Sequence, residues 1–392
     1  MQPVEPASGH LAFYQQHHIS PVRYRIENLD THFDRRDSLY RSLGLPPTAF
    51  RGVRVLEVAP GSGQNSLYVA ACRPLSFDLV EPNPAGRRDI QAAYEGLKQD
   101  HTEPRLHPLR FEAFTADNAF DIVLCENWLG SALNEIELVR KLASLVSPGG
   151  VLVLTIVPHS GFFPNVMRKL LALRTTDPSL DFETKTAQLV SIFGAHLSTI
   201  ANMTRSHADW VRDCLINPHY LNVALPLDKI VETLGAEMEI LATFPRFAQD
   251  WRWFKGLTGE ARRFNELTLE AYRQNSHNFL DYRQTFAPRS ADANAVLDEE
   301  FRAVHRAAVE WQQAAETADS STPIELTDCI GTSLRRIAVE LEAIDGTLAQ
   351  AVVELGSIWS ARQLDPAKIR DMKFFGPLFG RETVYVSFTR RR

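Results

Sequence analysis

Four short apolar runs in the first half of the chain have the length and composition of buried strands. They are VRVLEVAP from Val53, FDLVEP from Phe77, FDIVLCEN from Phe120 and VLVLTIVP from Val151. Runs that are apolar at nearly every position are typical of strands covered on both faces. The segments between them are long enough for crossover helices, which we place at 64–72, 85–98 and 135–146. The alternation predicts an open, mostly parallel sheet.

Long stretches of the chain have a helical pattern instead. Residues 1–50 predict an N-terminal helical cap, because apolar residues recur there at helical spacing. Residues 158–225 predict a helical lid by the same criterion. A helical block is expected at 246–380, with loops at 287–294 and 318–323, where small and polar residues gather.

Two further strands are expected near the end of the sheet. They are MEILATF from Met238 and VYVSF from Val384, whose alternation is typical of a half-buried strand. A weaker strand is expected at 105–110, although Pro108 has no N–H for a ladder. The expected organisation is a cap at 1–50, a core at 51–245 that includes the lid at 158–225, a helical insertion at 246–380, and a last core strand within 381–392.

The segment after the first strand has the composition of a ligand-binding turn. Glu57 lies in the strand, and Gly61 and Gly63 follow it just before a helix. Glycines permit a sharp turn and let a ligand approach the backbone, beside the unpaired amides of a helix N-terminus. In an open parallel sheet, ligands bind outside the carboxyl ends of the strands. This edge of the sheet is therefore the predicted site.

The second strand ends in Glu81, about twenty residues after the glycines, which is the spacing of a ribose-binding acid. A carboxylate there can accept hydrogen bonds from both ribose hydroxyls, so the pattern predicts an adenosine-type ligand. The dinucleotide fingerprint would place a third glycine where this chain has Ser66. That difference weakens the interpretation as an NAD site.

These residues resemble the class I S-adenosylmethionine-dependent methyltransferases. The matching motifs are VLEVAPGSG from Val55, the acid Glu81, FDIVLCEN from Phe120, and LVSPGGVLVLT from Leu145, which supplies a turn and the following strand. They cover about 51–157 together with the last strands. The resemblance implies a Rossmann-like, doubly wound α/β sheet with an antiparallel last strand, a helical cap and a helical subdomain. It also implies S-adenosylmethionine as the cofactor.

The resemblance assigns residues to parts of this cofactor. Glu57 and the turn would line its methionine end, and Glu81 would bind the ribose. Glu126 and Asn127 would form the floor beneath the sulfonium. The implied cofactor-binding residues are Glu57, Ala59, Pro60, Gly61, Ser62, Gly63, Asn65, Glu81, Pro82, Asn83, Glu126 and Asn127. Asn65 stands where the family has a third glycine.

Methyl transfer from a sulfonium is an in-line displacement in which the cofactor supplies the reactivity, so the protein mainly orients the reactants and excludes water. A base is needed only if the acceptor loses a proton. His159, just beyond the strand that starts at Val151, is the first candidate for that base, and Glu126 is the second. A capping or exposed role for His159 is an equal alternative. The segment IVPHSG offers no carboxylate, so we expect no metal ion.

Substrate contacts are expected from segments outside the strands. The candidates are Trp128, His219, Tyr220, Trp251 and Arg252. An arginine between two tryptophans can stack on or pair with a planar or anionic group, although ordinary packing explains these residues nearly as well. Residues 17–24 are expected to close over the cofactor, or else to form a surface helix end. Residues 390–392 are expected to be a solvated tail.

The formal net charge of −6 gives no overall positive field for nucleic acid or anionic lipid. The four cysteines are far apart, which fits neither a disulfide framework nor a zinc site. The N-terminal residues do not resemble a signal peptide, and the longest apolar stretch is too short to span a bilayer. We therefore expect a cytoplasmic protein without nucleic-acid or membrane partners, and we leave a homo-oligomer open.

Together these features predict a metal-independent methyltransferase that acts on a hydroxyl or amine of a small or carbohydrate-like acceptor, enclosed by the helical additions. The first alternative is an NAD-dependent oxidoreductase. The second is a non-catalytic binding or interaction protein that retains a cofactor pocket. An enzyme of the same fold that carries out non-methyl chemistry on the same cofactor is a third alternative.

Overall fold

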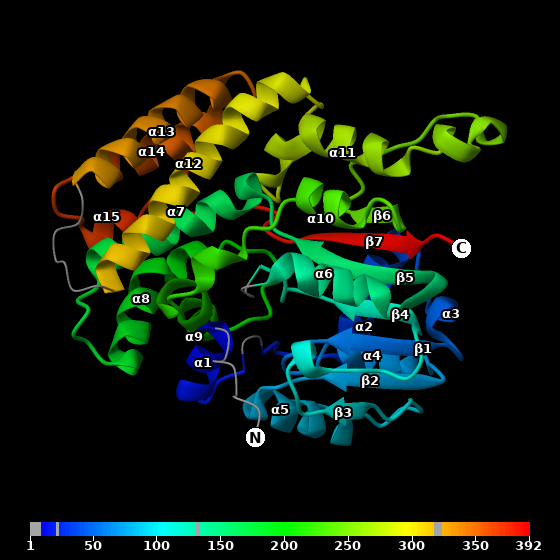
Figure 1. Ribbon diagram of the computed structural model, residues 1–392. Helices are drawn as coiled ribbons and strands as arrows, with labels where there is room; N and C mark the ends of the chain where they lie inside the picture. The colour runs from blue at the N-terminus through cyan, green and yellow to red at the C-terminus, as the bar shows by residue number, and fades with distance from the viewer. Residues whose placement is uncertain (1–8, 21–22, 131–133, 317–323) are drawn as a thin grey trace. The chain divides into compact units, whose positions relative to one another are not determined.

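The computed structural model describes residues 9–20, 23–130, 134–316 and 324–392 (Figure 1). The chain forms two compact units. The first comprises the chain up to Ile156 with Leu225–Tyr272 and Thr383–Arg392, and the second comprises Val157–Ala224 and Arg273–Glu382. Most of the predicted lid and most of the predicted insertion therefore fold as one unit, whereas residues 246–272 fold with the sheet.

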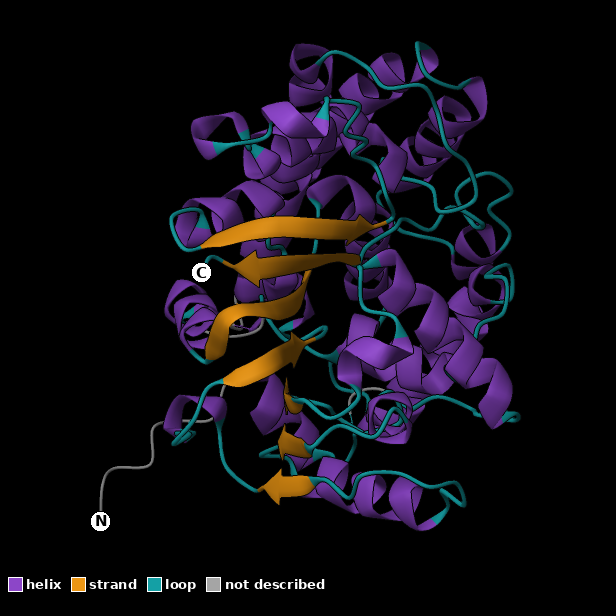
Figure 2. Cartoon of the chain, turned by 90° about the vertical axis from the view of Figure 1, so that its right-hand side faces the viewer, coloured by secondary structure: helices purple, strands orange, loops and turns teal. Residues whose placement is uncertain are grey.

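A seven-stranded sheet is the centre of the first unit (Figure 2). Its strands are β1 (Arg54–Val58), β2 (Ser76–Val80), β3 (Arg105–His107), β4 (Phe120–Cys125), β5 (Val146–Ile156), β6 (Met238–Phe244) and β7 (Val384–Arg390). They lie in the order β3-β2-β1-β4-β5-β7-β6. The first five strands pair in parallel, and β7 is antiparallel to both of its neighbours. The predicted Rossmann-like sheet with an antiparallel last strand is confirmed.

The helices of the first unit are α1 (Gly9–Gln16), α2 (Leu29–Ser42), α3 (Pro47–Phe50), α4 (Ser66–Ala71), α5 (Pro84–Glu95), α6 (Glu135–Ser144), α10 (Leu227–Leu234) and most of α11 (Phe264–Asn275), with short 3-10 turns η1 (Phe111–Ala113), η4 (Phe254–Gly256) and η5 (Gly259–Ala261). Helices α4, α5 and α6 begin within two residues of the crossover helices expected at 64–72, 85–98 and 135–146. Apolar side chains of α2, α4 and α5 share a buried core with β1, β2 and β4, which includes Tyr40, Val55, Tyr68 and Ile90. This packing fixes the carboxyl ends of the central strands.

The second unit is helical. Its elements are α7 (His159–Thr175), α8 (Phe182–Leu197), α9 (His207–Trp210), the π-helical η2 (Val211–Ile216), η3 (Tyr220–Val223), η6 (Ser276–Phe279), α12 (Ala291–Glu316), α13 (Ile324–Glu342), α14 (Gly346–Trp359) and α15 (Pro366–Arg370). Helices α12, α13 and α14 pack side by side (Figure 1). Buried Lys169 of α7 donates to the carbonyls of Leu215 and Asn217, at 2.7 and 3.0 Å. Its charge is thereby compensated by backbone dipoles inside an apolar core.

Two predicted loop or turn assignments are wrong at their boundaries. Helix α12 begins at Ala291, inside the loop expected at 287–294. The polar residues there cap the helix and pack against it, because Ser290 Oγ accepts from Ala293 N and buried Asn294 donates to the carbonyl of Arg273. The other expected loop, at 318–323, lies outside the described residues.

The turn expected before Val151 is instead an irregularity within β5, which already begins at Val146. The β4–β5 register shifts there, and Gly149 takes a φ of 79°. The weak strand expected at 105–110 is β3 and ends at His107, because the following proline cannot donate to the ladder.

The C-terminal arginines are not the solvated tail that their charge suggests. Arg390 belongs to β7, and its guanidinium donates to the carbonyls of Ser144 and Val146, at 3.3 and 2.6 Å. Arg391 forms an ion pair of 3.5 Å with Glu239 on β6. The tail expectation is therefore wrong for these two residues.

Within the described ranges, none of the helices combines the length and the apolarity that crossing a membrane would require.

Candidate cofactor site

The chain turns sharply after β1. Ala59, Gly61 and Gly63 have positive φ angles of 56°, 60° and 71°. The left-handed conformation costs a residue with a Cβ roughly 1–2 kcal/mol, so it is notable at Ala59. A hydrogen bond of 3.0 Å from Ala59 N to the carbonyl of Val80 holds this residue in place. The predicted strand, glycine turn and helix are all present.

Two glycines let the turn and α5 approach each other closely. A Cβ on Gly63 would lie 2.6 Å from Cγ1 of Ile90, and one on Gly86 would lie 2.7 Å from the carbonyl oxygen of Gly61. Either contact is too short for real atoms to adopt. Sequence reasoning identified Gly63 and missed Gly86, whose signal was a glycine in the first turn of an expected helix. A Cβ on Gly86 would also lie 3.2 Å from Cδ of Glu81, so this glycine leaves room for the carboxylate.

Glu81, directly after β2, ties that strand to the turn. Its buried carboxylate accepts from Gly61 N at 3.0 Å and from Asn83 N at 2.8 Å. Burial raises the pKa of Glu81 to about 7, and the two backbone hydrogen bonds and Arg87 oppose that rise. A carboxylate has about four lone-pair sites, so two N–H donors leave it able to accept further hydrogen bonds.

Glu57 on β1 is the second buried carboxylate at this edge. Its Oε2 atom is shielded from solvent and has no hydrogen-bond partner among the described residues. Burial, and then the charge of Glu126, raises the pKa of Glu57 to about 7, while Ser66 and Arg36 oppose the rise. An unpartnered buried carboxylate oxygen is costly, and a donor or a cation from a ligand would relieve it.

Glu126, directly after β4, is held by the N-terminal cap. Arg36 Nη2 donates to both of its carboxylate oxygens, at 2.6 and 2.8 Å, and Tyr40 Oη donates to one of them at 2.7 Å. The guanidinium and the carboxylate are both buried. Burial alone would lower the pKa of Arg36, but the neighbouring charge of Glu126 raises it well above its ordinary value.

Sequence reasoning assigned α2 to a cap and did not identify Arg36 or Tyr40 as site residues. Their spacing of four residues places both on one helical face. The sequence signal that could have identified Arg36 is its position as a charged residue on the buried face of α2, which also carries Leu39 and Tyr40. Nothing in the local sequence indicates that its partner is Glu126, which is 90 residues away.

Asn127 adopts a φ of 57° beside Glu126. Its backbone N–H donates to Thr155 Oγ1 at 2.7 Å, and its side-chain oxygen accepts from Thr383 Oγ1 at 3.2 Å. The ring of Trp128, which follows, packs edge-on against Phe111 at a centroid distance of 5.9 Å. The ends of β4, β5 and β7 are thus joined by side-chain hydrogen bonds at the predicted floor of the site.

Ile19 and Tyr24, from the N-terminal part of the chain, contact the turn and the residue before α5. Tyr24 N donates to Gln64 Oε1 at 2.6 Å, and Gln64 Nε2 donates back to the carbonyl of Tyr24 at 2.8 Å. Asn83 Nδ2 donates to the carbonyl of Ile19 at 3.1 Å. The segment expected to close over the cofactor therefore contacts two stretches of the predicted cofactor edge.

The remaining predicted cofactor residues lie in the same stretches. Ser62 is buried and donates to Gln64 at 3.2 Å. Asn65 precedes α4 without a side-chain capping bond. The carbonyl of Pro82 accepts from Arg87 at 2.7 Å. The structure therefore brings the turn and the ends of β1, β2 and β4 together at the carboxyl edge of the sheet.

His159 belongs to the second unit, at the start of α7. Its ring centroid lies 5.1 Å from that of His305, and its Nδ1 is buried without a hydrogen-bond partner in the described part of the chain. Burial, followed by the charges of His305 and Arg302, lowers the pKa of His159 to about 3. The imidazole is therefore neutral at physiological pH.

His219 and Tyr220 also belong to the second unit. Tyr220 is buried, donates to Glu382 at 3.3 Å and accepts from Asn165 at 3.1 Å. Burial raises the pKa of Glu382, and hydrogen bonds from Tyr220 and Asn165 oppose that rise. His219 directly precedes η3, and its backbone N–H donates to the side-chain oxygen of Asn217 at 3.0 Å.

Trp251 and Arg252 lie in the loop between β6 and α11. Trp251 is 90% exposed, so it lines no enclosed site. Arg252 donates to both oxygens of Asp250 and to the carbonyls of Ala261 and Arg262. The arginine therefore closes its own loop.

Comparison with known proteins identifies part of the chain. Residues 32–200 match a family described as the methyltransferase domain. The chain is 33% identical over 131 residues to the uncharacterized proteins Rv1405c of Mycobacterium tuberculosis and Mb1440c of Mycobacterium bovis. That match covers 33% of this chain and 45% of each relative, so it spans less than half of their length.

Solved structures show partial likeness. The PKMT2 protein of Rickettsia typhi in complex with AdoHcy is 16% identical, with a TM-score of 0.36, over 54% of this chain and 43% of that one. The N-methyltransferase NodS of Bradyrhizobium japonicum in complex with S-adenosyl-L-homocysteine is 16% identical, with a TM-score of 0.30, over 38% of this chain and 74% of that one.

The family match agrees with the sheet order, the antiparallel last strand and the glycine turn with its two acids. Residues 32–200 therefore match a methyltransferase domain, which agrees with the family predicted from the motifs.

Replacing Arg36 by methionine should lower the free energy of unfolding by about 3–5 kcal/mol, because Glu126 would be left as a buried, unpaired charge. Urea unfolding of the variant measures this loss. The double variant Arg36→Met/Glu126→Leu should recover much of it. Arg35→Met, at an exposed neighbour on the same helix, is the matched control, and equal stability of the two single variants would contradict the assignment.

Proposed function

We propose that this protein binds S-adenosylmethionine at the carboxyl edge of the sheet and transfers its methyl group to a hydroxyl or amine of a small or carbohydrate-like acceptor. The observation that carries the proposal is the unpartnered, buried oxygen of Glu57 beside the glycine turn. The family match supports the reaction class. The acceptor class rests on the lack of overall positive charge and on the large helical unit.

The residues at this edge fit the cofactor chemically. An ammonium or sulfonium group is a suitable partner for the buried carboxylate of Glu57. Glu81 retains acceptor sites for the two hydroxyls of a ribose. The turn is tightly packed through Gly63, so a ligand meets backbone at this point rather than long side chains. The donors and acceptors present therefore match the two ends of the cofactor.

When bound, the cofactor supplies a methyl group on a positively charged sulfur, which needs no further activation by the protein. The chain's contribution is orientation and exclusion of water. Arg36 and Tyr40 hold the Glu126 carboxylate in one orientation. Tyr24 and Ile19 form hydrogen bonds with Gln64 and Asn83 beside the turn.

His159 is the better candidate base of the two predicted ones. Both oxygens of Glu126 already accept hydrogen bonds from Arg36, and one also accepts from Tyr40, so this carboxylate is engaged within the protein. His159 is neutral at physiological pH and has an unpartnered ring nitrogen, so it can accept a proton from an acceptor hydroxyl.

We propose a cytoplasmic location, since all four cysteines are free thiols. The proposed partner is a small-molecule acceptor, without nucleic acid and without a metal ion, and self-association stays open. Among the described residues, no group of three or more His, Cys, Asp or Glu side chains is arranged to hold a metal.

Glu81→Gln should weaken the binding of S-adenosylmethionine by about 10- to 100-fold, because each ribose hydrogen bond left without its charged acceptor is worth about 1–3 kcal/mol. Calorimetric titration of the purified variant measures the change in Kd. Glu95→Gln, at an exposed position of α5, is the control and should bind as the unmodified protein does. Unchanged affinity of Glu81→Gln would refute the placement of the ribose.

The affinity for S-adenosylmethionine should rise as the pH increases through about 7, because the pKa values of Glu57 and Glu81 are both raised to about 7 and their ionised forms attract the cofactor. Below that pH both carboxyls are protonated and bind a cation less well. Glu57→Gln should make the pH dependence of Kd shallower between pH 6 and 8, a window of about one unit on each side of these values. An affinity that is independent of pH would contradict the proposed contact.

His159→Ala should lower turnover by about 100-fold or more, with little change in cofactor affinity, if the imidazole accepts the acceptor's proton. The release of S-adenosylhomocysteine in the presence of an acceptor that the unmodified protein methylates measures turnover. His101→Ala, in the other unit, is the control. Full activity of His159→Ala would remove the histidine from the mechanism.

A further inference from the structure

The loop between β6 and α11 exposes three large aromatic side chains. Trp251, Trp253 and Phe254 are 90%, 69% and 66% exposed, and the rings of the last two lie 5.0 Å apart. Figure 1 shows this loop, in yellow-green, as a projection beyond β6 and α11. Exposed apolar side chains that cluster in this way are uncommon on a monomer surface and mark sites of interaction.

The shape of the loop is fixed at its base, so the exposure does not come from a loose segment. Arg252 binds Asp250 near one end and the carbonyls of Ala261 and Arg262 near the other, with donor–acceptor distances of 2.6 to 3.0 Å. The guanidiniums of Arg252 and Arg262 also lie over the ring of Phe264, at 5.6 and 5.2 Å from its centroid. Several side-chain hydrogen bonds therefore fix the base of the loop that carries the exposed aromatic residues.

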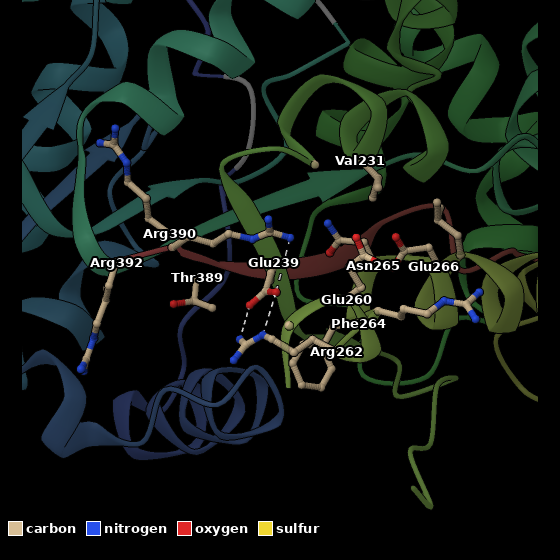
Figure 3. A pocket seen from close by; sticks show the side chains of 16 residues that line it. Val231, Glu239, Glu260, Arg262, Phe264, Asn265, Glu266, Thr389, Arg390 and Arg392 are labelled. Atoms are coloured by element: carbon tan, nitrogen blue, oxygen red, sulfur yellow. Dashed lines mark hydrogen bonds and ion pairs between the residues drawn. The ribbon is translucent and has the colours of Figure 1, made fainter. Parts of the chain in front are cut away.

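Cationic side chains surround the tip and the base of the loop. Lys255 Nζ lies 5.8 Å from the centre of the Trp253 ring. The base of the loop, through Gly259 to Phe264, lines a pocket of about 1080 Å³ together with residues 389–392 (Figure 3). Arg263 and Arg392 line this pocket without an ion pair to any residue in the described ranges.

Acidic groups compensate only part of this charge. Glu239 pairs with Arg262 and lies 3.5 Å from Arg391, as the dashed contacts of Figure 3 indicate for this carboxylate. Glu260 and Glu266 also line the pocket. The surface nevertheless carries more Lys and Arg than Asp and Glu, although the chain as a whole has a net charge of −6. The loop at 250–263 and the pocket at its base therefore form a surface with a net positive charge.

The net charge of the whole chain favours no membrane partner, but the charge of this surface differs from that of the whole chain. We propose, against the expectation from net charge, that the loop at 250–263 and the arginines beside it dock this protein on an anionic lipid surface. Aromatic residues such as Trp and Phe beside Lys and Arg are typical of protein surfaces that lie at the membrane–water interface. Anionic lipid headgroups attract such basic residues, while the aromatic rings enter the headgroup region. The absence of a spanning helix among the described residues does not bear on binding to a surface.

The size of the tip favours a membrane over a protein partner. Complete burial of three large aromatic side chains covers roughly 450–750 Å². A stable protein interface, including one between two copies of this chain, buries about 800 Å² on each partner and is usually flatter than a projecting loop. A lipid surface needs no complementary shape and accepts a small convex tip.

The test is co-sedimentation of the full chain with vesicles of phosphatidylcholine, with and without phosphatidylglycerol. We expect binding that requires the anionic lipid and weakens with salt. The variant Trp251→Ser/Trp253→Ser/Phe254→Ser should reduce the partition coefficient about tenfold or more. Arg263→Glu/Arg392→Glu should reduce it by a similar factor, chiefly at low salt. Leu75→Ala, at a position 71% exposed elsewhere on the first unit, is the control and should bind normally.

Failure of the unmodified protein to bind anionic vesicles would overturn the proposal, as would binding that the aromatic variant retains. Light scattering on the same samples identifies the rival: a dimer that the aromatic variant converts to a monomer would assign the tip to a second copy of the chain. The measurement uses no cofactor or acceptor, so its outcome is independent of the proposed methyl transfer.

Discussion

The site depends on the burial of three carboxylates, Glu57, Glu81 and Glu126, at one edge of a parallel sheet. Removing charge from water is costly, and like charges near one another raise the cost. The three carboxylates differ in how this cost of burial is compensated. Backbone amides of the turn and of Asn83 hold Glu81, Arg36 and Tyr40 hold Glu126, and Glu57 keeps one oxygen without a partner. The edge is therefore electrostatically incomplete, and a cationic ligand would complete it.

The N-terminal cap is part of this arrangement. Helix α2 brings Arg36 across to the end of β4, and the segment before it binds Gln64 and Asn83. Residues that precede the first strand therefore compensate the charge and contact the turn. Loss of the cap would leave Glu126 buried without its cation, so stability and ligand binding are coupled through one ion pair.

Local sequence was sufficient for the sheet and for the glycine turn at its carboxyl edge. The unbroken apolar runs gave the strands, and Gly61, Gly63 and Glu81 marked the turn and the acid because their spacing follows from local geometry. Arg36, Tyr40 and Gly86 could not be assigned in that way. Arg36 and Tyr40 bind a residue that is far away in the sequence, and Gly86 is needed because two elements approach each other closely. No local sequence pattern indicates either of these facts.

The predictions were least accurate for polar and charged segments, because composition alone does not show which contacts such side chains make. The polar residues at 287–294 cap and support α12, and the terminal arginines bind carbonyls and Glu239. Arg252 was expected to meet substrate because it lies between two tryptophans, whereas its donors close the loop that displays them. A polar or charged run predicts solvent by default, and only tertiary structure shows when such side chains have internal partners.

The most direct test of the account is calorimetric titration of S-adenosylmethionine and S-adenosylhomocysteine into the purified protein, with NAD as the control ligand. Both sulfur ligands carry the ammonium and the ribose that Glu57 and Glu81 are arranged to bind. The account predicts saturable binding of both with micromolar Kd values and no comparable binding of NAD. Absence of binding by the sulfur ligands, or a preference for NAD, would contradict it.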